Sequence, residues 1–223
     1  TVTDLWEAWI DLMEAVRQSA KEENIDDLWI SLTCYVNPSP WYLQWANSVW
    51  IQCVYDQKDA GFGTTKMNKQ ITYRDACYYD FLKNHQFQFP LQNLYNHDPV
   101  YGKEGTQMTI KTATDEDFQN YLYMLSTRGT AFWELYYSDS IMTDGKYEIT
   151  GEFLEWAEEN YHMLKNSKMI GGKPDITKLG DGNSDETQAE AYGFSCFDGK
   201  DGIISLRNPV SYTHLRAHET SLH

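Results

Sequence analysis

The chain has 223 residues and a formal net charge of −15 at pH 7. An acidic surface of this kind repels phosphate backbones, so we expect no nucleic acid partner. Aromatic residues make up 15% of the sequence, far more than a disordered chain contains, and no run of about 18 or more uncharged apolar residues occurs in it. We therefore expect a folded protein with no membrane segment in this sequence.

The first predicted elements are a helix and a buried strand. Apolar residues recur every three or four positions across residues 4–22, with Thr3 as the candidate N-cap, which is typical of an amphipathic helix. The apolar and β-branched run at 28–36 favours a buried strand, which ends at the two prolines within 37–40. The aromatic stretch 41–50 fits either a helix or an irregular segment.

Helices and strands then alternate along the chain. Helical spacing recurs at 73–83, 115–127 and 152–166, and short apolar runs at 87–94 and 130–137 favour strands. Such alternation is typical of parallel βα units, which build either a barrel or an open sheet.

The pattern changes after the last helix. Residues 191–197 and 202–207 form two short apolar runs around a Gly- and Asp-containing turn, which indicates a β-hairpin. The Gly-, Asp- and Lys-rich stretch before them, 171–190, is typical of a linker. We therefore expect one unit over 1–170 and the start of an all-β domain over 191–209.

Residues 210–220 resemble the in-frame translation of a transposase adapter used to prepare DNA sequencing libraries, and every residue of the stretch matches. We expect 210–223 to be a non-native tail, with a genuine basic tail as the alternative. Three of the six histidines, His214, His218 and His223, lie there, and the four cysteines lack metal-ligand spacing. We therefore expect no metal and no other cofactor.

The loops that follow the predicted strands contain carboxylates and aromatic rings. In a parallel barrel, side chains that do chemistry lie in such loops. Two acids on either side of a glycosidic bond are what glycoside hydrolysis needs, and no Gly-rich phosphate loop argues for another chemistry. The candidates in these loops are Trp41, Asp56, Asp59, Asn96, His97, Asp98, Ser138 and Asp139.

Several of these stretches resemble the α-galactosidase clan (clan D) of glycoside hydrolases. Residues 35–41 and 49–60 resemble the region after that clan's sixth barrel strand, where a Trp-x-x-Asp stretch lines the active site. Residues 94–99 and 128–135 resemble its strand-seven loop and its eighth strand, and 192–209 resembles the beginning of its C-terminal β-sandwich. The resemblance covers most of 28–209 in order and spacing.

The resemblance implies a retaining mechanism with two carboxylates. Clan members have a nucleophile on strand four and an acid/base carboxylate near the end of strand six, so with 28–36 as strand six the nucleophile would lie upstream of Thr1. Where α-galactosidases have an acid/base motif with Asp, residues 37–41 contain none. Asp56 is our candidate for the acid role; the alternatives are a turn-capping Asp56 and altered or lost activity.

The remaining candidates each have a structural alternative. Trp41, which follows two prolines, is the best stacking platform for a sugar. Glu134 is a candidate sugar ligand, or a core-edge acid paired with Arg128.

The strand-seven loop offers three further sugar contacts. An Asx-turn explains Asn96, His97 and Asp98 nearly as well as hydroxyl binding. We interpret Arg74 and Asp75, at the start of a helix, as structural.

The sequence therefore predicts an α/β fold: the C-terminal part of a (β/α)₈ TIM barrel followed by the start of a β-sandwich. The predicted function is that of a fragment of a glycoside hydrolase acting on α-linked sugars, secreted or on a bacterial cell surface, with carbohydrate as its partner. The alternatives are a non-catalytic carbohydrate-binding protein with the same barrel and an open-sheet enzyme unrelated to glycans. Alone, the fragment would be inactive, because three of eight strands do not close a barrel.

Overall fold

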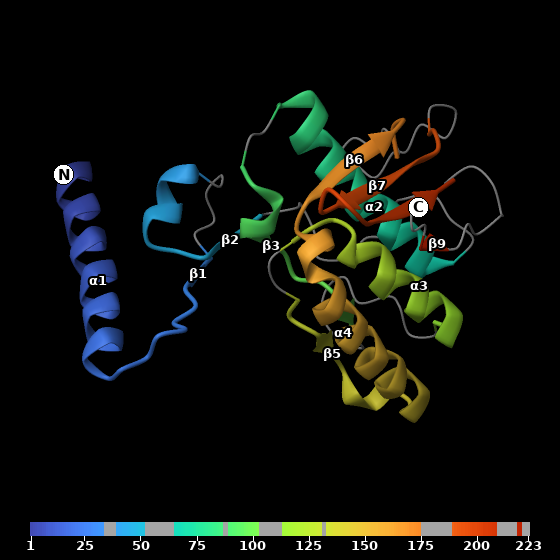
Figure 1. Ribbon diagram of the computed structural model, residues 1–223, viewed down its shortest axis with the longest axis horizontal. Coiled ribbons are helices and arrows are strands. Elements are labelled where there is room, and N and C mark those ends of the chain that lie inside the picture. The colour runs from blue at the N-terminus through green and yellow to red at the C-terminus, as the bar shows by residue number, and fades with distance from the viewer. Residues whose placement is uncertain are drawn as a thin grey trace.

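The computed structural model has a slender N-terminal part and a broader body (Figure 1). One long helix, α1 (Val2–Glu22), stands at one side, and a short parallel sheet separates it from the other helices. The body combines those helices with an antiparallel sheet. The structure describes residues 1–33, 39–51, 65–86, 89–102, 113–130, 133–174, 189–208 and 218–219.

Helix α1 begins two residues earlier than its apolar periodicity predicts. Thr1 is the N-cap, because its side chain accepts a hydrogen bond from the backbone N–H of Asp4 and the Asp4 carboxylate bonds back to the cap. This reciprocal pair is a capping box. The expected cap at Thr3 is therefore wrong: Thr3 lies within the first turn of the helix.

Five very short strands pair in parallel. Strands β1 (Ser31–Leu32), β2 (Ser48–Trp50) and β3 (Leu94–Tyr95) form one sheet in chain order. Strands β4 (Val100–Tyr101) and β5 (Tyr136–Tyr137) form a second parallel pair. Parallel pairing agrees with the expected βα units, and the proposal of a barrel rests on the sequence resemblance.

The strands are shorter than the apolar runs that predicted them. In its described part, the run at 87–94 meets Pro90 and the 3₁₀ turn Leu91–Asn93, and strand geometry follows at Leu94. In the run at 130–137, Leu135 has a positive φ of 48°, and the strand starts after it. The stretch 41–50 contains the 3₁₀ turn Pro40–Gln44 and then β2, a strand that the sequence did not predict.

In the described part of the body three helices pack together, and each has a threonine as its N-cap. They are α2 (Lys66–Tyr79), α3 (Asp115–Ser126) and α4 (Asp144–Leu164), and the cap side chains of Thr65, Thr114 and Thr143 accept a backbone N–H of the first turn. The expected helix at 115–127 agrees with α3, which ends one residue earlier.

Helices α2 and α4 begin seven or eight residues earlier than predicted. The early turns of α2 bury polar side chains, among them Asn68, Gln70 and Thr72, so the apolar periodicity misses them. A π-helical turn, Asp80–Asn84, extends α2.

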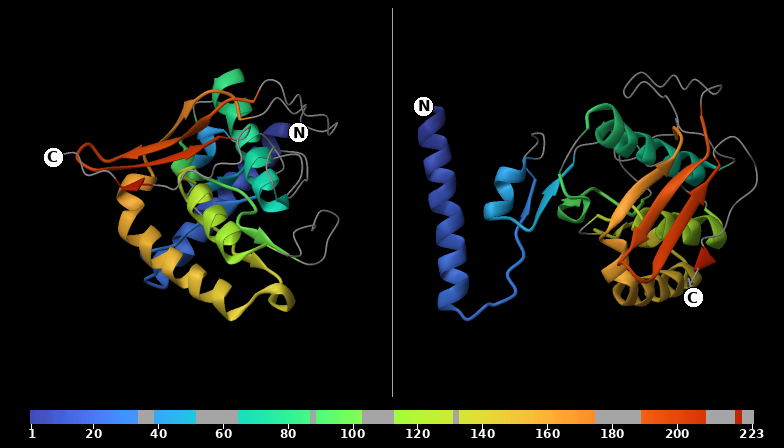
Figure 2. Two further views of the ribbon diagram at one scale, coloured as in Figure 1. Left: turned by 90° about the vertical axis from the view of Figure 1, so that its right-hand side faces the viewer. Right: turned by 45° about the horizontal axis from the view of Figure 1, so that its top comes forward.

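An antiparallel sheet lies against these helices (Figure 2). Its strands are β6 (Ser167–Gly171), β7 (Tyr192–Phe197), β8 (Gly202–Arg207) and β9 (His218–Glu219), in that order. The predicted hairpin is confirmed, with Tyr192 paired to Arg207 and Phe197 to Gly202. Strand β6 starts before the expected linker at 171–190 and pairs with β7.

Helices and sheet share one apolar core. Phe118, Leu122 and Phe153 from α3 and α4 belong to the same buried cluster as Phe194 and Ile203 from the hairpin. The hairpin therefore packs directly on the helical unit. A smaller cluster around Tyr42, Val49 and Leu94 fills the N-terminal part.

Candidate functional site

Two predicted site residues far apart in the sequence meet where the chain passes from the first parallel sheet to the second. The imidazole Nδ1 of His97, two residues after β3, hydrogen bonds to the carboxylate of Glu134, two residues before β5. Both side chains remain partly accessible, at 28% and 22%. We call these two residues the His97–Glu134 pair.

Aromatic rings lie beside this pair. The indole of Trp50, at the end of β2, has its centroid 5.0 Å from that of the His97 ring. The ring of Tyr136, which is largely exposed, lies 6.3 Å from the His97 ring. The sequence did not single out either ring as a site residue; for Trp50, the signal was its position at the end of a short apolar run.

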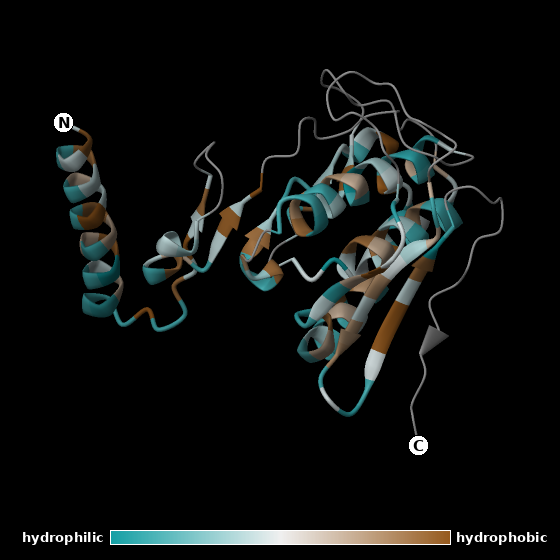
Figure 3. Cartoon of the chain, turned by 90° about the horizontal axis from the view of Figure 1, so that it is seen from above, coloured by the Kyte–Doolittle hydropathy of each residue, from teal (hydrophilic) through white to brown (hydrophobic). Residues whose placement is uncertain are grey.

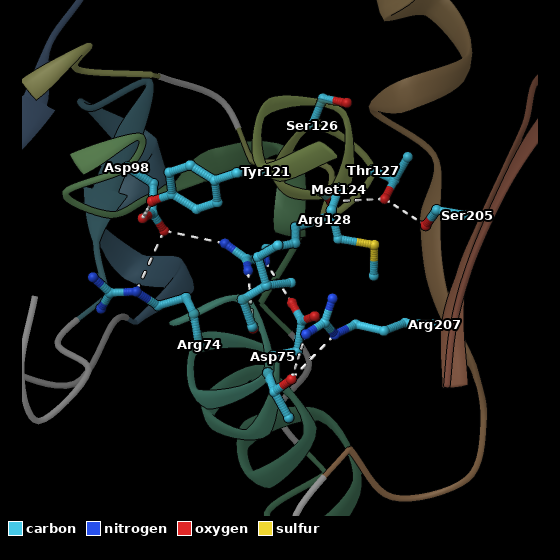
Figure 4. A network of polar contacts seen from close by, with 12 residues as sticks. Arg74, Asp75, Asp98, Tyr121, Met124, Ser126, Thr127, Arg128, Ser205 and Arg207 are labelled. Carbon is cyan, nitrogen blue, oxygen red and sulfur yellow. Dashed lines mark hydrogen bonds and ion pairs between the residues drawn. The ribbon is translucent and has the colours of Figure 1, made fainter. Parts of the chain in front are cut away.

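Asp98, the third predicted member of the loop, lies in a buried ion network (Figure 4). Its Oδ1 accepts a hydrogen bond from the Tyr121 hydroxyl at 2.7 Å, and its Oδ2 accepts one from Arg128 Nη1 at 3.2 Å. The Nε of Arg74 lies 3.4 Å from the same Oδ2. With only 5% of Asp98 exposed, its carboxylate is committed to protein donors.

The network continues away from the site into α2 and the hairpin. Arg128 Nε donates to Asp75 Oδ1 at 2.6 Å, and the Tyr192 hydroxyl donates to Asp75 Oδ2 at 2.6 Å. Burial alone would lower the pKa of Arg128, but Asp75 and Asp98 outweigh it and raise that pKa. Burial, reinforced by Asp98, holds the pKa of Tyr121 well above its ordinary value. Arg128 is thus charged, and Tyr121 and Tyr192 are neutral, at neutral pH.

Arg74 and Asp75 therefore have the structural role expected of them, in the middle of α2 rather than at its start. Arg128 binds Asp75 and Asp98, while Glu134 binds His97, so the suggested Arg128–Glu134 pairing is wrong. The residues of the network are distant in sequence. The sequence signal for them is a charged residue at a position that the helical periodicity places in the core.

The other predicted site residues lie elsewhere. Asn96 is 3% exposed, and its carbonyl accepts the backbone N–H of Asp98 at 2.7 Å in a tight turn. Trp41 is half-buried in a cluster of rings, with centroids 4.7 Å from Trp6 and Trp45. Asp56 falls outside the described residues.

Comparisons with protein-family models, curated proteins and solved structures found no match to this chain. No helix among the described residues is long and apolar enough to cross a membrane. The same residues contain no group of three or more His, Cys, Asp or Glu side chains that could hold a metal ion.

Proposed function

We propose that this chain is part of a glycoside hydrolase that acts on α-linked sugars such as α-galactosides by a retaining two-carboxylate mechanism. The observation that carries the proposal is the His97–Glu134 pair, partly exposed beside the Trp50 and Tyr136 rings. The sequence resemblance to the α-galactosidase clan supplies the linkage and the reaction.

This group of side chains has the chemistry that a sugar ring requires. The carboxylate of Glu134 accepts hydrogen bonds from hydroxyls, the imidazole of His97 adds a polar contact, and an aromatic face packs against sugar C–H groups. A net charge of −15 favours a neutral ligand over an anionic one. We therefore assign neutral α-linked oligosaccharides as the ligands.

Catalysis in this proposal depends on Asp56 as the acid/base carboxylate, an assignment that rests on the sequence resemblance alone. Sugar contact is assigned to His97 and Glu134. Because Asn96 and Asp98 are buried, they make no direct contact with the sugar in this proposal. Trp41 contributes only through the part of its side chain that is exposed.

A second candidate is a carbohydrate-binding protein without catalysis. It is favoured because protein groups already bind both carboxylates of the site. Asp98 is bound by two arginines and Tyr121, and Glu134 is bonded to His97. A glycosidase needs two carboxyl groups facing each other across the scissile bond. Binding without turnover in the parent protein, whose upstream strands would supply the nucleophile, is the outcome that selects this candidate.

The test is a titration of the chain with raffinose, a neutral α-galactoside, followed by NMR of the indole and imidazole signals. We expect raffinose to shift the Trp50 and His97 signals, and lactose, a β-galactoside, to leave them in place. Glu134→Gln should weaken binding by roughly 10- to 100-fold, the typical loss for a hydrogen bond to a charged group.

The matched control is Glu158→Gln, because Glu158 is an exposed glutamate on α4 and its loss should leave affinity unchanged. Absence of any signal change at millimolar raffinose would overturn the proposal. Turnover of a nitrophenyl α-galactoside by that parent protein, abolished by Asp56→Asn, would establish the enzyme over the binding protein.

A further inference from the structure

We propose that Asp98 and Arg128 are positioning residues that hold the His97–Glu134 pair in its geometry. In this role the ion network, although it lies out of contact with any ligand, fixes the two groups that would contact one. The consequence for sugar affinity rests on the proposed function; the positioning itself does not.

The backbone of Asp98 connects both members of the pair. Asp98 is bonded covalently to His97, and its carbonyl oxygen accepts the backbone N–H of Glu134 at 2.9 Å. The next contact in the same direction, from the N–H of Tyr136 to the carbonyl of Pro99 at 2.8 Å, continues this pairing into β4 and β5. A displacement of Asp98 would therefore be transmitted to both His97 and Glu134.

The side chain of Asp98 is fixed from three directions. Tyr121 binds one carboxylate oxygen, and Arg74 and Arg128 bind the other. The two arginine side chains are 1% exposed and that of Asp98 is 7% exposed. In such a dry environment each of these interactions is stronger than in water, and an unpaired group is costly.

Arg128 is itself anchored to α2 and, through Asp75, to β7. Its Nε binds Asp75 on α2, whose second oxygen accepts the hydroxyl of Tyr192 on β7. Its Nη2 also lies 3.4 Å from the carbonyl oxygen of Ile71. Continuous contacts therefore run from the antiparallel sheet through α2 and Arg128 to Asp98. Figure 4 shows the part of this network from Asp75 through Arg128 to Asp98.

The experiment records the imidazole signals of His97 in the full chain labelled at histidine, with the assignment made from a His97→Gln variant. Arg128→Lys keeps the charge but cannot bind Asp75 and Asp98 together. Tyr121→Phe keeps the ring and removes the hydroxyl that binds Asp98. We expect both to shift the His97 signals while the fold persists, and to weaken raffinose binding on the order of tenfold.

Ser205→Ala is the control. It removes the 2.7 Å contact between the Ser205 and Thr127 hydroxyls. Thr127 precedes Arg128 in the sequence, but this contact does not involve Asp98. The substitution should therefore leave the His97 signals in place. Wild-type His97 signals in folded Tyr121→Phe would overturn the proposal, and this variant decides alone where Arg128→Lys does not fold.

The two proposals fail in different ways. Shifted His97 signals in a chain that never binds raffinose would uphold positioning and reject the sugar ligand. Raffinose binding with unmoved His97 signals in the variants would support the sugar ligand and reject positioning.

Discussion

Helices α1 and α3 have similar amphipathic sequences and opposite surroundings. On α1, Leu5 and Leu12 are 73% and 56% exposed, whereas on α3, Phe118 and Leu122 are fully buried. Figure 3 shows apolar residues along α1, which stands apart from the body. Periodicity thus predicts that a helix forms and which face is apolar, but a tertiary partner determines how much that face stabilises the fold.

Among the described residues, the contacts of α1 with other elements are mainly aromatic. The ring of Trp9 lies 5.2 Å from the rings of Trp41 and Trp45, and Arg17 donates to the carbonyl of Trp45 at 2.7 Å. In the body, by contrast, α3 and α4 enclose a continuous core with the hairpin. We therefore expect mutations to be costly in the body and mild on the exposed face of α1.

The largest effect is expected for Leu122→Ala. Removing a fully buried side chain leaves a cavity between α3 and its neighbours and should lower the free energy of unfolding by about 2–5 kcal/mol. Urea denaturation followed by circular dichroism measures it. A loss below about 1 kcal/mol would contradict the tight packing of the body.

The next effect is a loss of stability at high pH. Burial raises the pKa of Cys196 from 9.0 to about 11. The folded state thus favours the neutral thiol, so its stabilisation is complete below about pH 9 and lost as the pH rises through 11. This group contributes up to about 3 kcal/mol.

Denaturation midpoints measured between pH 8 and 11 test this pH dependence. Cys196→Ala should flatten the curve but not abolish its slope, because burial also raises the pKa values of Tyr121 and Tyr192 well above their ordinary range. A variant curve identical to that of the wild type would refute the role of the thiol.

A smaller effect is expected at the start of α4. Thr143→Ala removes the side chain that accepts the Lys146 N–H at 3.2 Å and should cost about 1 kcal/mol. Thr143→Ser, which keeps the hydroxyl, is the control and should stay within about 0.5 kcal/mol of the wild type. Thermal melting distinguishes the two variants.

The smallest effect is expected for Leu5→Ala on α1. The side chain is 73% exposed, and alanine is at least as good a helix former, so the free energy of unfolding should change by less than about 0.5 kcal/mol. The same substitution in α3 and α1 thus compares the two regions directly. A large loss at Leu5 would show that this face of α1 is covered in solution.

The sequence predicted the elements that carry local signals. Helix α3 has both a threonine cap and an apolar face, and the β7–β8 hairpin has two apolar runs around a turn. The parallel strands are only two or three residues long, too short for any periodicity to appear. In α2, the turns that the prediction missed bury the polar side chains of Asn68, Gln70 and Thr72, which show no apolar periodicity.

The site was predictable only in parts. His97 and Glu134 were each identified as candidates, but no local pattern joins residues 37 positions apart. Asp98 was chosen for the same chemical reason as Glu134, although three protein donors occupy it. The residue type alone does not show whether a carboxylate binds a ligand or another group of the protein.

The cluster of tryptophan rings that contacts α1 affects the fluorescence of the protein. Trp41 lies 4.7 Å from both Trp6 and Trp45 and 5.2 Å from Trp9, close enough for the excited states of neighbouring indoles to couple. Detachment of α1 would abolish the coupling of Trp41 with Trp6 and Trp9, but not with Trp45, and would change the tryptophan emission. The helical circular dichroism signal of the body would persist. The docking of one helix is therefore visible by spectroscopy, without any label.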